Sequence, residues 1–426
     1  MPRPISFDVT HLASRLPVDA PSGIDKVDLA YAEHFAEQPC DALVHYGVRR
    51  ARVHSTTSLP ALAASGRSRW SAAPPHEDAA YAGLYRALTG ADPEFPRGSG
   101  KTAEPGRKTR ARRRLDQLSW RFAPGRVPLR EGSIYLNVAQ HAFEYRRFFS
   151  WLHERPDVFP VFLVHDILPL DWPEYFPPGY KQRFERRTET IKAHAKAIVT
   201  TSDAVADQIR KVYSEWNRTP VPIHTQPLPS SMPPADSIPA AAEDAALSAT
   251  PYFVVLGTIE PRKNHLLLLN IWRRLAEHPH PPKLVVIGNR GWENEQVCDV
   301  LDRSTLVRRN MIECAGLGDQ ALMKILGNAR GLLMPSFAEG YGLPVVEALA
   351  LGVPVIASDI PVFREVSQGK ATFIHPLDGP RWLEAILDLC DPTTPASRDA
   401  RRRAEAYRPP SWPDYFAGIR SFLAGL

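Results

Sequence analysis

Residues 252–357 repeat a pattern that few folds satisfy: short, nearly continuous apolar runs separated by segments with helical periodicity. The runs are rich in Val, Ile and Leu and do not alternate with polar residues, which is typical of parallel strands buried on both faces. This pattern predicts a doubly wound α/β domain that binds ligands at the carboxyl ends of its strands. The predicted strands are 252–257, 283–288, 311–315, 331–334 and 353–357, with helices at 265–275, 320–329 and 344–351.

The first half of the chain shows the same alternation less regularly. Residues 53–130 have little periodicity and are rich in Arg, Ala, Pro and Gly, as expected of an irregular insertion. Prolines and a run of alanines between residues 220 and 248 are typical of a linker. The predicted elements of this half are strands at 134–138, 161–164 and 197–200 and helices at 143–154, 180–195 and 204–213.

The length of 426 residues exceeds what one hydrophobic core usually organises, so we expect two domains. The linker divides the chain into an N-terminal domain of residues 1–235, which includes the insertion, and a C-terminal domain of residues 236–405. Both read as Rossmann-like, and the cleft between them is the expected ligand site because the strand ends of both sheets would face it.

Composition limits the setting of the protein. Four widely spaced cysteines form neither a disulfide scaffold nor a metal-ligand pair, which favours a reducing compartment. Neither a signal-type hydrophobic run nor 18 consecutive apolar residues occur, so we expect a cytoplasmic protein with at most peripheral membrane contact. The net charge of +5 is uneven, because seven Lys and Arg residues lie within residues 101–114.

The basic stretch 101–114 has three interpretations. A solvated loop is the simplest. Attraction to anionic lipid headgroups is the second, with Trp120 and Phe122 as interfacial anchors. Nucleic-acid binding is disfavoured, because the stretch has little aromatic interleaving and the chain has no recognised nucleic-acid motif.

The first candidate binding segment follows the strand 252–257 and reads TIEPRKNH. Gly257 at the strand end lets a ligand approach the backbone closely. Arg262 and Lys263 then stand just before a predicted helix, where a planar guanidinium and a compact ammonium suit a diphosphate. A solvated basic turn explains these two cations equally well on their own.

The second candidate segment, residues 336–348, follows the strand 331–334. Gly340 and Gly342 flank Tyr341 in a loop that can expose consecutive backbone N–H groups, and the helix after it would direct its positive end toward an anion. Glu339 lies in the loop and Glu347 in the helix, so both can face one ligand and accept hydrogen bonds from sugar hydroxyls. A helix-dipole role is the alternative for Glu347.

These segments together resemble the retaining glycosyltransferases of the GT-B fold, family 4. The resemblance covers most of residues 250–370 and rests on GTIEPRKN, the GYGLP loop, the two glutamates and EALALGVPVIASDIPVFREV. It implies that Glu339 lies by the donor sugar and that Glu347 binds the ribose. It also implies that Arg262 and Lys263 bind the pyrophosphate, while backbone amides of Gly340, Tyr341, Gly342 and Leu343 hold sugar hydroxyls and phosphate. The base pocket is expected around residues 315–317, including Leu317.

The resemblance extends to the first half. The segment FLVHDILPLDWPEYF resembles the mannosyltransferase-like branch, which implies that His165 and Asp166 face the cleft as positioning residues in an acceptor-binding domain. Gly23 and the helix start at Asp25 and Lys26 match the family's first strand-to-helix loop, where Gly23 lets the backbone approach the diphosphate. Here Ser22–Gly23 stands where the family often has paired glycines. A closing helix within 406–426 is expected to return to the N-terminal domain.

The expected activity is a metal-independent, retaining transfer of a hexose to a hydroxyl of a glycan or lipid-linked oligosaccharide in surface polysaccharide synthesis. GDP-mannose is the favoured donor, and no cofactor is expected. The alternatives are a UDP- or dTDP-sugar donor on the same fold, or a non-catalytic protein that binds nucleotide, glycan or anionic membrane. A sugar phosphorylase or epimerase fits the two glutamates and two cations less well, and a dehydrogenase is disfavoured because no G-x-G-x-x-G follows a first strand.

Overall fold

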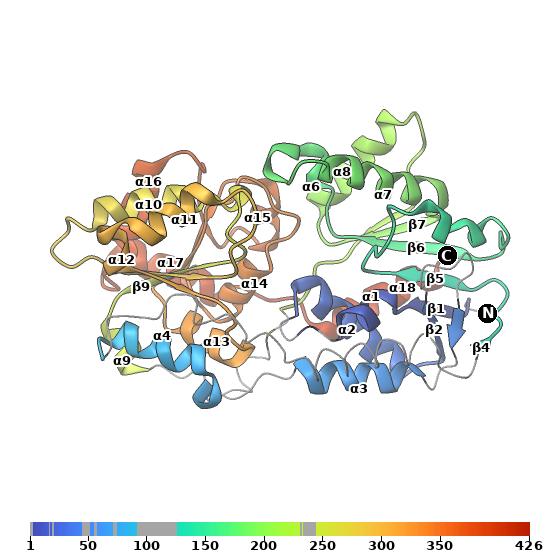
Figure 1. The fold of residues 1–426 in the computed structure, drawn as a ribbon, viewed down its shortest axis with the longest axis horizontal. Helices are drawn as coiled ribbons and strands as arrows, with labels where there is room; N and C mark the ends of the chain where they lie inside the picture. The colour runs from blue at the N-terminus through green and yellow to red at the C-terminus, as the bar shows by residue number, and fades with distance from the viewer. Residues whose placement is uncertain are drawn as a thin grey trace.

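The computed structural model describes residues 3–16, 18, 21–44, 52–54, 58–70, 75–91, 126–230, 232 and 244–426. Two parallel sheets, each covered by helices, form two lobes that lie side by side along the long axis of the molecule (Figure 1). The predicted α/β class with two doubly wound domains is confirmed. The basic stretch 101–114, Trp120 and Phe122 lie outside the described residues.

The N-terminal sheet has eight strands in the order β4-β3-β2-β1-β5-β6-β7-β8. The six strands from β2 to β8 in this order are parallel, whereas β3 and β4 add an antiparallel edge. The inner strands β5 and β7 are buried throughout, because helices cover both faces. The strands are β1 Ile5–Asp8, β2 Cys40–Val44, β3 Arg52–His54, β4 Arg126–Val127, β5 Ile134–Asn137, β6 Phe159–Val164, β7 Ala197–Thr200 and β8 Ile223–Thr225.

The helices of the N-terminal lobe follow the strand ends. Helix α2 begins with a capping box in which Ser22 and Asp25 satisfy each other's backbone N–H groups, as the helix-opening sequence predicts. The helices are α1 Thr10–Arg15, α2 Gly23–Ala36, α3 Ser58–Trp70, α6 Leu168–Asp171, α7 Tyr180–His194 and α8 Asp203–Glu215.

The C-terminal sheet has six parallel strands in the order β11-β10-β9-β12-β13-β14. The order reverses between β9 and β12, so the loops after these two strands lie side by side at the ligand edge. The strands are β9 Tyr252–Leu256, β10 Lys283–Ile287, β11 Met311–Cys314, β12 Gly331–Met334, β13 Val355–Ser358 and β14 Thr372–Ile374. The helices are α10 His265–Leu275, α11 Glu295–Arg303, α12 Thr305–Asn310, α13 Asp319–Gly327, α14 Leu343–Ala350, α15 Pro361–Val366, α16 Gly379–Cys390 and α17 Pro395–Glu405.

Two segments cross between the lobes. Helix α18, Trp412–Ala424, packs on α2, where the hydroxyls of Tyr31 and Tyr415 are 2.8 Å apart and the rings of His34 and Phe416 stack. Helix α4, Ala79–Thr89, lies beneath the C-terminal lobe beside α9, Ala245–Ala249 (Figure 1). Lys283 donates to the Ala87 carbonyl and thereby fixes α4 there.

Direct bonds also join the lobes on both sides of the cleft. The Glu365 carboxylate accepts hydrogen bonds from the first backbone N–H groups of α8, at 2.6 Å from Asp203 N and 3.1 Å from Ala204 N. Lys26 on α2 pairs with Asp319 on α13, with 2.7 Å between Nζ and Oδ1. A carboxylate at a helix N-terminus and a partly buried ion pair both favour close approach of the two domains.

Two local expectations differ from the structure. Residues 143–154 form two 3₁₀ turns, Arg146–Phe148 and Ser150–Leu152, because Phe143, Phe149 and Trp151 all turn inward and a regular helix cannot bury all three. The segment expected to be irregular holds α3 and α4.

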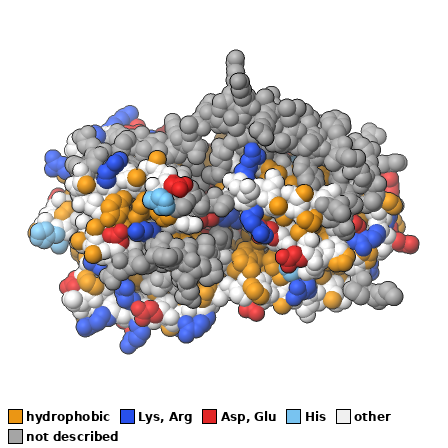
Figure 2. Space-filling model, turned by 90° about the horizontal axis from the view of Figure 1, so that it is seen from below, with side chains coloured by type: hydrophobic (Ala, Val, Ile, Leu, Met, Phe, Trp, Pro, Cys, Tyr) orange, Lys and Arg blue, Asp and Glu red, His pale blue; other side chains and the backbone are white. Residues whose placement is uncertain are grey.

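Among the described residues, no helix is long and apolar enough to cross a membrane. On the face seen in Figure 2, basic, acidic and apolar side chains are interspersed.

Candidate donor and acceptor site

The loops after β9 and β12 form the centre of the candidate donor site. The backbone N–H of Phe337 donates to the Arg262 carbonyl at 2.9 Å, which joins the loops directly. Asn264 adopts a left-handed conformation with φ 54°, and its amide donates to the carbonyls of Pro335 and Pro376. An Asn tolerates this conformation better than most residues, so its presence after PRK is explained locally.

Arg262, Lys263 and Glu339 form one ion-paired network. Glu339 Oε1 lies 2.6 Å from Lys263 Nζ, and Glu339 Oε2 lies 2.6 Å from Arg262 Nη1. Arg262 also pairs with Glu260 at 2.5 Å, and Ser336 donates to Glu339 at 2.7 Å. All three side chains of the network are at most 13% exposed. Such a pair persists in a buried place only because each charge is compensated.

The electrostatics of this network keep Glu339 ionised. Burial alone would raise the pKa of Glu339, but the charges of Arg262 and Lys263 outweigh burial and lower the pKa to about 2. Arg262 keeps its Nε–H buried without a hydrogen-bond partner among the described residues, so its guanidinium retains a donor for an anionic ligand. Gly257 has no Cβ, and a Cβ there would stand 3.1 Å from Lys263 Cε, so this glycine allows Lys263 to fold back over the strand end.

The loop before α14 has the backbone geometry of an anion site. Gly342 has φ 97°, and a Cβ on it would come within 2.7 Å of the Phe363 ring, so only glycine fits. Tyr341 donates its hydroxyl to the Leu228 carbonyl at 2.8 Å, which leaves its backbone as the group that a ligand can use. Helix α14 then begins at Leu343, where Pro344 has no N–H and the N–H of Val345 donates to the Gly342 carbonyl at 2.9 Å. Glu347 is buried one turn further along α14.

His165 and Asp166 stand at the end of β6 and meet the donor loop across the cleft. A Cβ on Gly340 would lie 2.7 Å from Asp166 Cβ and 2.9 Å from Asp166 Oδ2, so the two loops are in contact. Burial raises the pKa of Asp166, while Arg262 opposes this effect. The structure thus brings the predicted acceptor-side pair next to the predicted donor-side residues.

His165 is held in one neutral form. Burial lowers the pKa of His165 to about 4, and its Nε2 lies 2.8 Å from the Val138 carbonyl. Because a carbonyl only accepts hydrogen bonds, the proton resides on Nε2 and Nδ1 is an acceptor. This fits the predicted positioning role, since a nitrogen that accepts can receive a hydroxyl hydrogen bond.

The remaining predicted residues lie at the same edge. Gly23 approaches the start of α14, because a Cβ on it would stand 3.2 Å from Leu343 Cδ1. Leu317 follows β11 and is partly buried. The next residue, Gly318, donates its N–H to Asp78 at 2.9 Å, so the segment before α4 reaches the predicted base pocket.

Sequence reasoning missed His141. It is exposed at the end of β5, between two residues in left-handed conformations, Gln140 with φ 51° and Ala142 with φ 62°. The rings of His11 and His141 are 5.8 Å apart, and His11 lies 3.0 Å from Asp28. Strands β1, β5 and β6 are neighbours, so a histidine follows each of three adjacent strands. His165 directly follows β6, whereas three residues separate His141 from the end of β5, so a search limited to the first residue after a strand does not find it.

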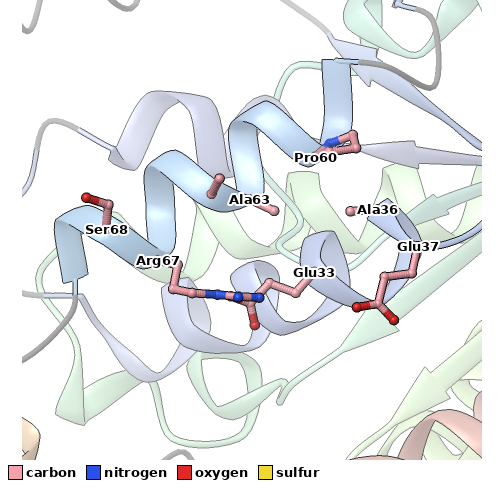
Figure 3. A pocket seen from close by; sticks show the side chains of 8 residues that line it. Glu33, Ala36, Glu37, Pro60, Ala63, Arg67 and Ser68 are labelled. Carbon is pink, nitrogen blue, oxygen red and sulfur yellow. The ribbon is translucent and has the colours of Figure 1, made fainter.

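A separate pocket of about 510 Å³ opens between the end of α2 and α3 (Figure 3). Arg67 reaches across it to Glu33, with 2.7 Å between Nε and Oε1. None of the predicted site residues lines it. Among the described residues, no group of three or more His, Cys, Asp or Glu is placed to hold a metal ion.

Two Rossmann-like domains with ligand-binding loops that meet across a cleft define a GT-B protein. Residues 241–399 match the family model described as "Glycosyl transferases group 1". Sucrose-phosphate synthase from Thermosynechococcus elongatus has the same fold, with a TM-score of 0.59 at 16% identity over the full length of both chains. The α,α-trehalose 6-phosphate synthase from Burkholderia multivorans has a TM-score of 0.57 at 14% identity, covering 100% of this chain and 98% of that one.

Several relatives by sequence are mannosyltransferases. The serotype-specific mannosyltransferase WbdA of Escherichia coli is 31% identical over 227 residues, 50% of this chain and 28% of that protein. O-antigen chain mannosyltransferase B of the same organism is 29% identical over 57% of this chain and 66% of its own length. The chain thus spans little more than a quarter of WbdA. These findings support the resemblance to the group 1 glycosyltransferases of the GT-B fold and to their mannosyltransferase-like branch, and the family match itself lies in the C-terminal domain.

Proposed function

We propose that the chain transfers a hexose, with retention of anomeric configuration, from a nucleotide sugar to a hydroxyl of a glycan or lipid-linked acceptor. The observation that carries this proposal is the contact between Gly340 and Asp166, which sets the Arg262–Lys263–Glu339 network against the acceptor-side loop. A nucleotide-sugar donor and a hydroxyl acceptor need this arrangement: cations for the leaving diphosphate, beside neutral polar groups for the attacking oxygen.

In the proposed reaction, Arg262, Lys263 and the first N–H groups of α14 bind the diphosphate, and Glu347 binds the ribose. The acceptor oxygen bonds to the anomeric carbon as the bond from that carbon to the phosphate oxygen breaks. The acceptor proton passes to the departing phosphate, on the same face of the sugar. Arg262 and Lys263 stabilise the charge that develops on the diphosphate, and no cofactor takes part.

His165, Asp166 and Glu339 position the reactants in this proposal. Neutral His165 accepts a hydroxyl hydrogen bond at Nδ1, and Glu339, held ionised by its two cations, accepts hydrogen bonds from the donor sugar. Close approach of the two domains, which the Glu365 and Lys26 contacts favour, excludes water from the donor and limits its hydrolysis.

We propose mannose from GDP-mannose as the donor and synthesis of a surface polysaccharide at the inner face of the membrane as the setting. The names of the mannosyltransferase relatives support the sugar and the O-antigen relatives support the setting. A UDP- or dTDP-sugar is the alternative donor. The expected base pocket around Leu317 is a short loop without charged side chains, so its sequence does not favour one base over another.

A nucleotide panel tests the donor site. Thermal unfolding of the protein is measured with GDP, UDP, ADP, dTDP and CMP, and we expect one diphosphate to stabilise it by about 2.7 kcal/mol at a hundred times its dissociation constant. The Arg262→Ala/Lys263→Ala variant should lose this stabilisation. Arg290→Ala is the matched control, because Arg290 is ion-paired with Asp302 and Glu313 outside the site.

Transfer assays with the responding nucleotide sugar then test the chemistry. Glu347→Ala should weaken nucleotide binding, whereas Arg262→Ala should lower turnover by about 10²- to 10³-fold, as loss of a transition-state donor does. Normal transfer by both variants would show that the site lies elsewhere. No response of the wild-type protein to any nucleotide would contradict the proposed donor site.

A further inference from the structure

A row of stacked aromatic side chains leads away from the donor loop. The row consists of Phe337 from the C-terminal domain and Tyr175 and Trp172 from the N-terminal domain. Tyr175 and Phe337 stack with ring centroids 5.4 Å apart and an interplanar angle of 7°. Trp172 and Tyr175 stack at 5.9 Å and 20°. Phe337 is two residues before Glu339, so the aromatic row begins at the donor site.

The aromatic row is held in place by both domains. Trp292 donates its indole N–H to the Tyr175 carbonyl at 3.0 Å, and Phe337 is bound through its backbone to Arg262. Side chains in such a place are pre-organised, so a ligand that stacks on them loses little affinity to their ordering.

A second aromatic group continues the surface on the N-terminal domain. Tyr145 is 50% exposed and lies 5.4 Å from Phe148 between ring centroids, with the Arg147 guanidinium 5.1 Å from the Phe148 centroid. Arg183, one turn after Tyr180 on α7, pairs with Glu144, the neighbour of Tyr145, and the Tyr180 ring stacks on Phe176, the neighbour of Tyr175. Rings and guanidinium groups therefore follow one another from the donor loop outward.

The chemistry of this surface suits a carbohydrate chain. Trp172 is 38% exposed and has one side on Tyr175, so its other face is accessible to a ligand. An aromatic face carries negative charge density that attracts the C–H groups on the apolar face of a pyranose ring. Arg147 and Arg183 are exposed and supply donors for the hydroxyl groups around it, and buried Glu144 holds Arg183 in place.

We propose that Trp172 and Tyr145, with the rings between them, bind successive sugar units of the acceptor glycan behind its reacting end. This inference rests on the proposed function, because it takes Asp166 as the place where the reacting hydroxyl lies. It assigns to this surface a glycan of several units rather than a single sugar. The end unit lies at the cleft, and the units behind it follow the aromatic surface outward.

Acceptor length is the variable that tests this proposal. Transfer from GDP-mannose is measured to linear α-linked mannose oligosaccharides of one, two and four units. We expect Trp172→Ala to raise KM for the tetrasaccharide about tenfold or more, with a much smaller effect on the single sugar and none on KM for the donor. Tyr145→Ala should act on the tetrasaccharide alone, and Tyr145→Phe, which keeps the ring, should restore most of the affinity.

The controls separate this proposal from a structural role and from the proposed function. Leu306→Ala removes an exposed apolar side chain of α12 in the C-terminal domain and should change no KM. An equal rise in KM for all three acceptors, or no rise in either aromatic variant, would overturn the aromatic surface. If the wild-type protein transfers to no acceptor, the proposed function fails. Calorimetric binding of the tetrasaccharide, lost in Trp172→Ala, would still support the aromatic surface, and its absence in the wild type would refute it.

Discussion

The donor and acceptor sides of the candidate site are built from different kinds of side chain. On the donor side, two adjacent loops supply a buried network of Arg262, Lys263 and Glu339 within about 80 residues of sequence. On the acceptor side, histidines follow three different strands, and the aromatic side chains come from several loops. The first side is buried and compact, and the second is partly exposed and dispersed.

This difference follows from the ligands that we propose for the two sides. A diphosphate carries concentrated charge at fixed spacing, and a short loop with two cations and a helix N-terminus satisfies it. A glycan offers neutral hydroxyls and apolar ring faces, which need several weak contacts spread over a longer surface. The donor side therefore has a compact sequence motif, whereas the acceptor side is recognisable in sequence only through the segment FLVHDILPLDWPEYF.

Gly340→Ala tests the point where the two sides meet, and we expect a larger effect from it than from changes at His265 or Ala142. A Cβ would stand 2.7 Å from Asp166 Cβ and 3.1 Å from the His165 carbonyl oxygen, so the loops must separate. Because a misplacement of about 1 Å can cost about 10²-fold in rate, we expect kcat to fall by that order. Stabilisation by GDP should persist, since the diphosphate ligands all belong to the C-terminal domain.

The control for this change is Gly327→Ala in the same domain. No atom lies within 4 Å of a Cβ placed on Gly327, so this variant should keep full activity. If Gly340→Ala transfers sugar at the wild-type rate, the Asp166 contact is not needed for catalysis. Loss of GDP binding in Gly340→Ala would show that the two sides are not separable in this way.

The pH dependence of the free energy of unfolding tests whether the donor side contains a buried neutral group in addition to its paired charges. His265 follows Lys263, is 4% exposed, and neither ring nitrogen has a hydrogen-bond partner among the described residues. Burial lowers its pKa to about 4, below the unfolded value of about 6.5, so its contribution to stability is complete above pH 6.5 and is lost as pH falls toward 4. We expect the free energy of unfolding to be roughly 2 kcal/mol lower at pH 5 than at pH 7.5 from this residue alone.

Urea unfolding at several pH values measures this slope. His265→Leu should flatten it between pH 7.5 and pH 5, whereas replacement of the exposed His280 by Leu should leave it unchanged. Burial also lowers the pKa values of His165 and His194 to about 4, so part of the slope should survive in His265→Leu. An identical slope in wild type and His265→Leu would contradict the neutral state of this side chain.

Sequence predicted the fold class and the donor loops because both depend on local patterns. The strand at Val355–Ser358 and the helix at Tyr180–His194 lie within a few residues of their predicted ranges. Gly257, Arg262 and Glu339 come together because the strands before them are neighbours, a consequence of parallel topology. Their catalytic roles stay predictions, which the transfer assays measure.

The structural features that the sequence did not predict depend on contacts between distant segments. Helix α4 lies within the stretch expected to be irregular, and nothing in its sequence indicates that its apolar face packs on the C-terminal domain. Residues 143–154 contain enough apolar side chains for an amphipathic helix. In the structure, Phe143 and Phe149 are nevertheless buried by a segment of 3₁₀ turns. The left-handed conformation of Ala142 was not predictable from the sequence, because alanine usually avoids this conformation.

Ala142→Gly is the smallest of these changes and tests whether the backbone strain beside His141 serves the acceptor side. An alanine at φ 62° costs about 1 kcal/mol or more, so glycine there should raise the free energy of unfolding by about 0.5 kcal/mol after its greater freedom in the unfolded chain is counted. The control Ala82→Gly, at an exposed position of α4, should lose about 1 kcal/mol instead. If the strain holds His141 toward the acceptor, Ala142→Gly should also raise KM for the acceptor a few-fold without changing KM for the donor. Greater stability with unchanged acceptor KM would separate this strain from acceptor binding, and lower stability would show that Ala142 is not strained.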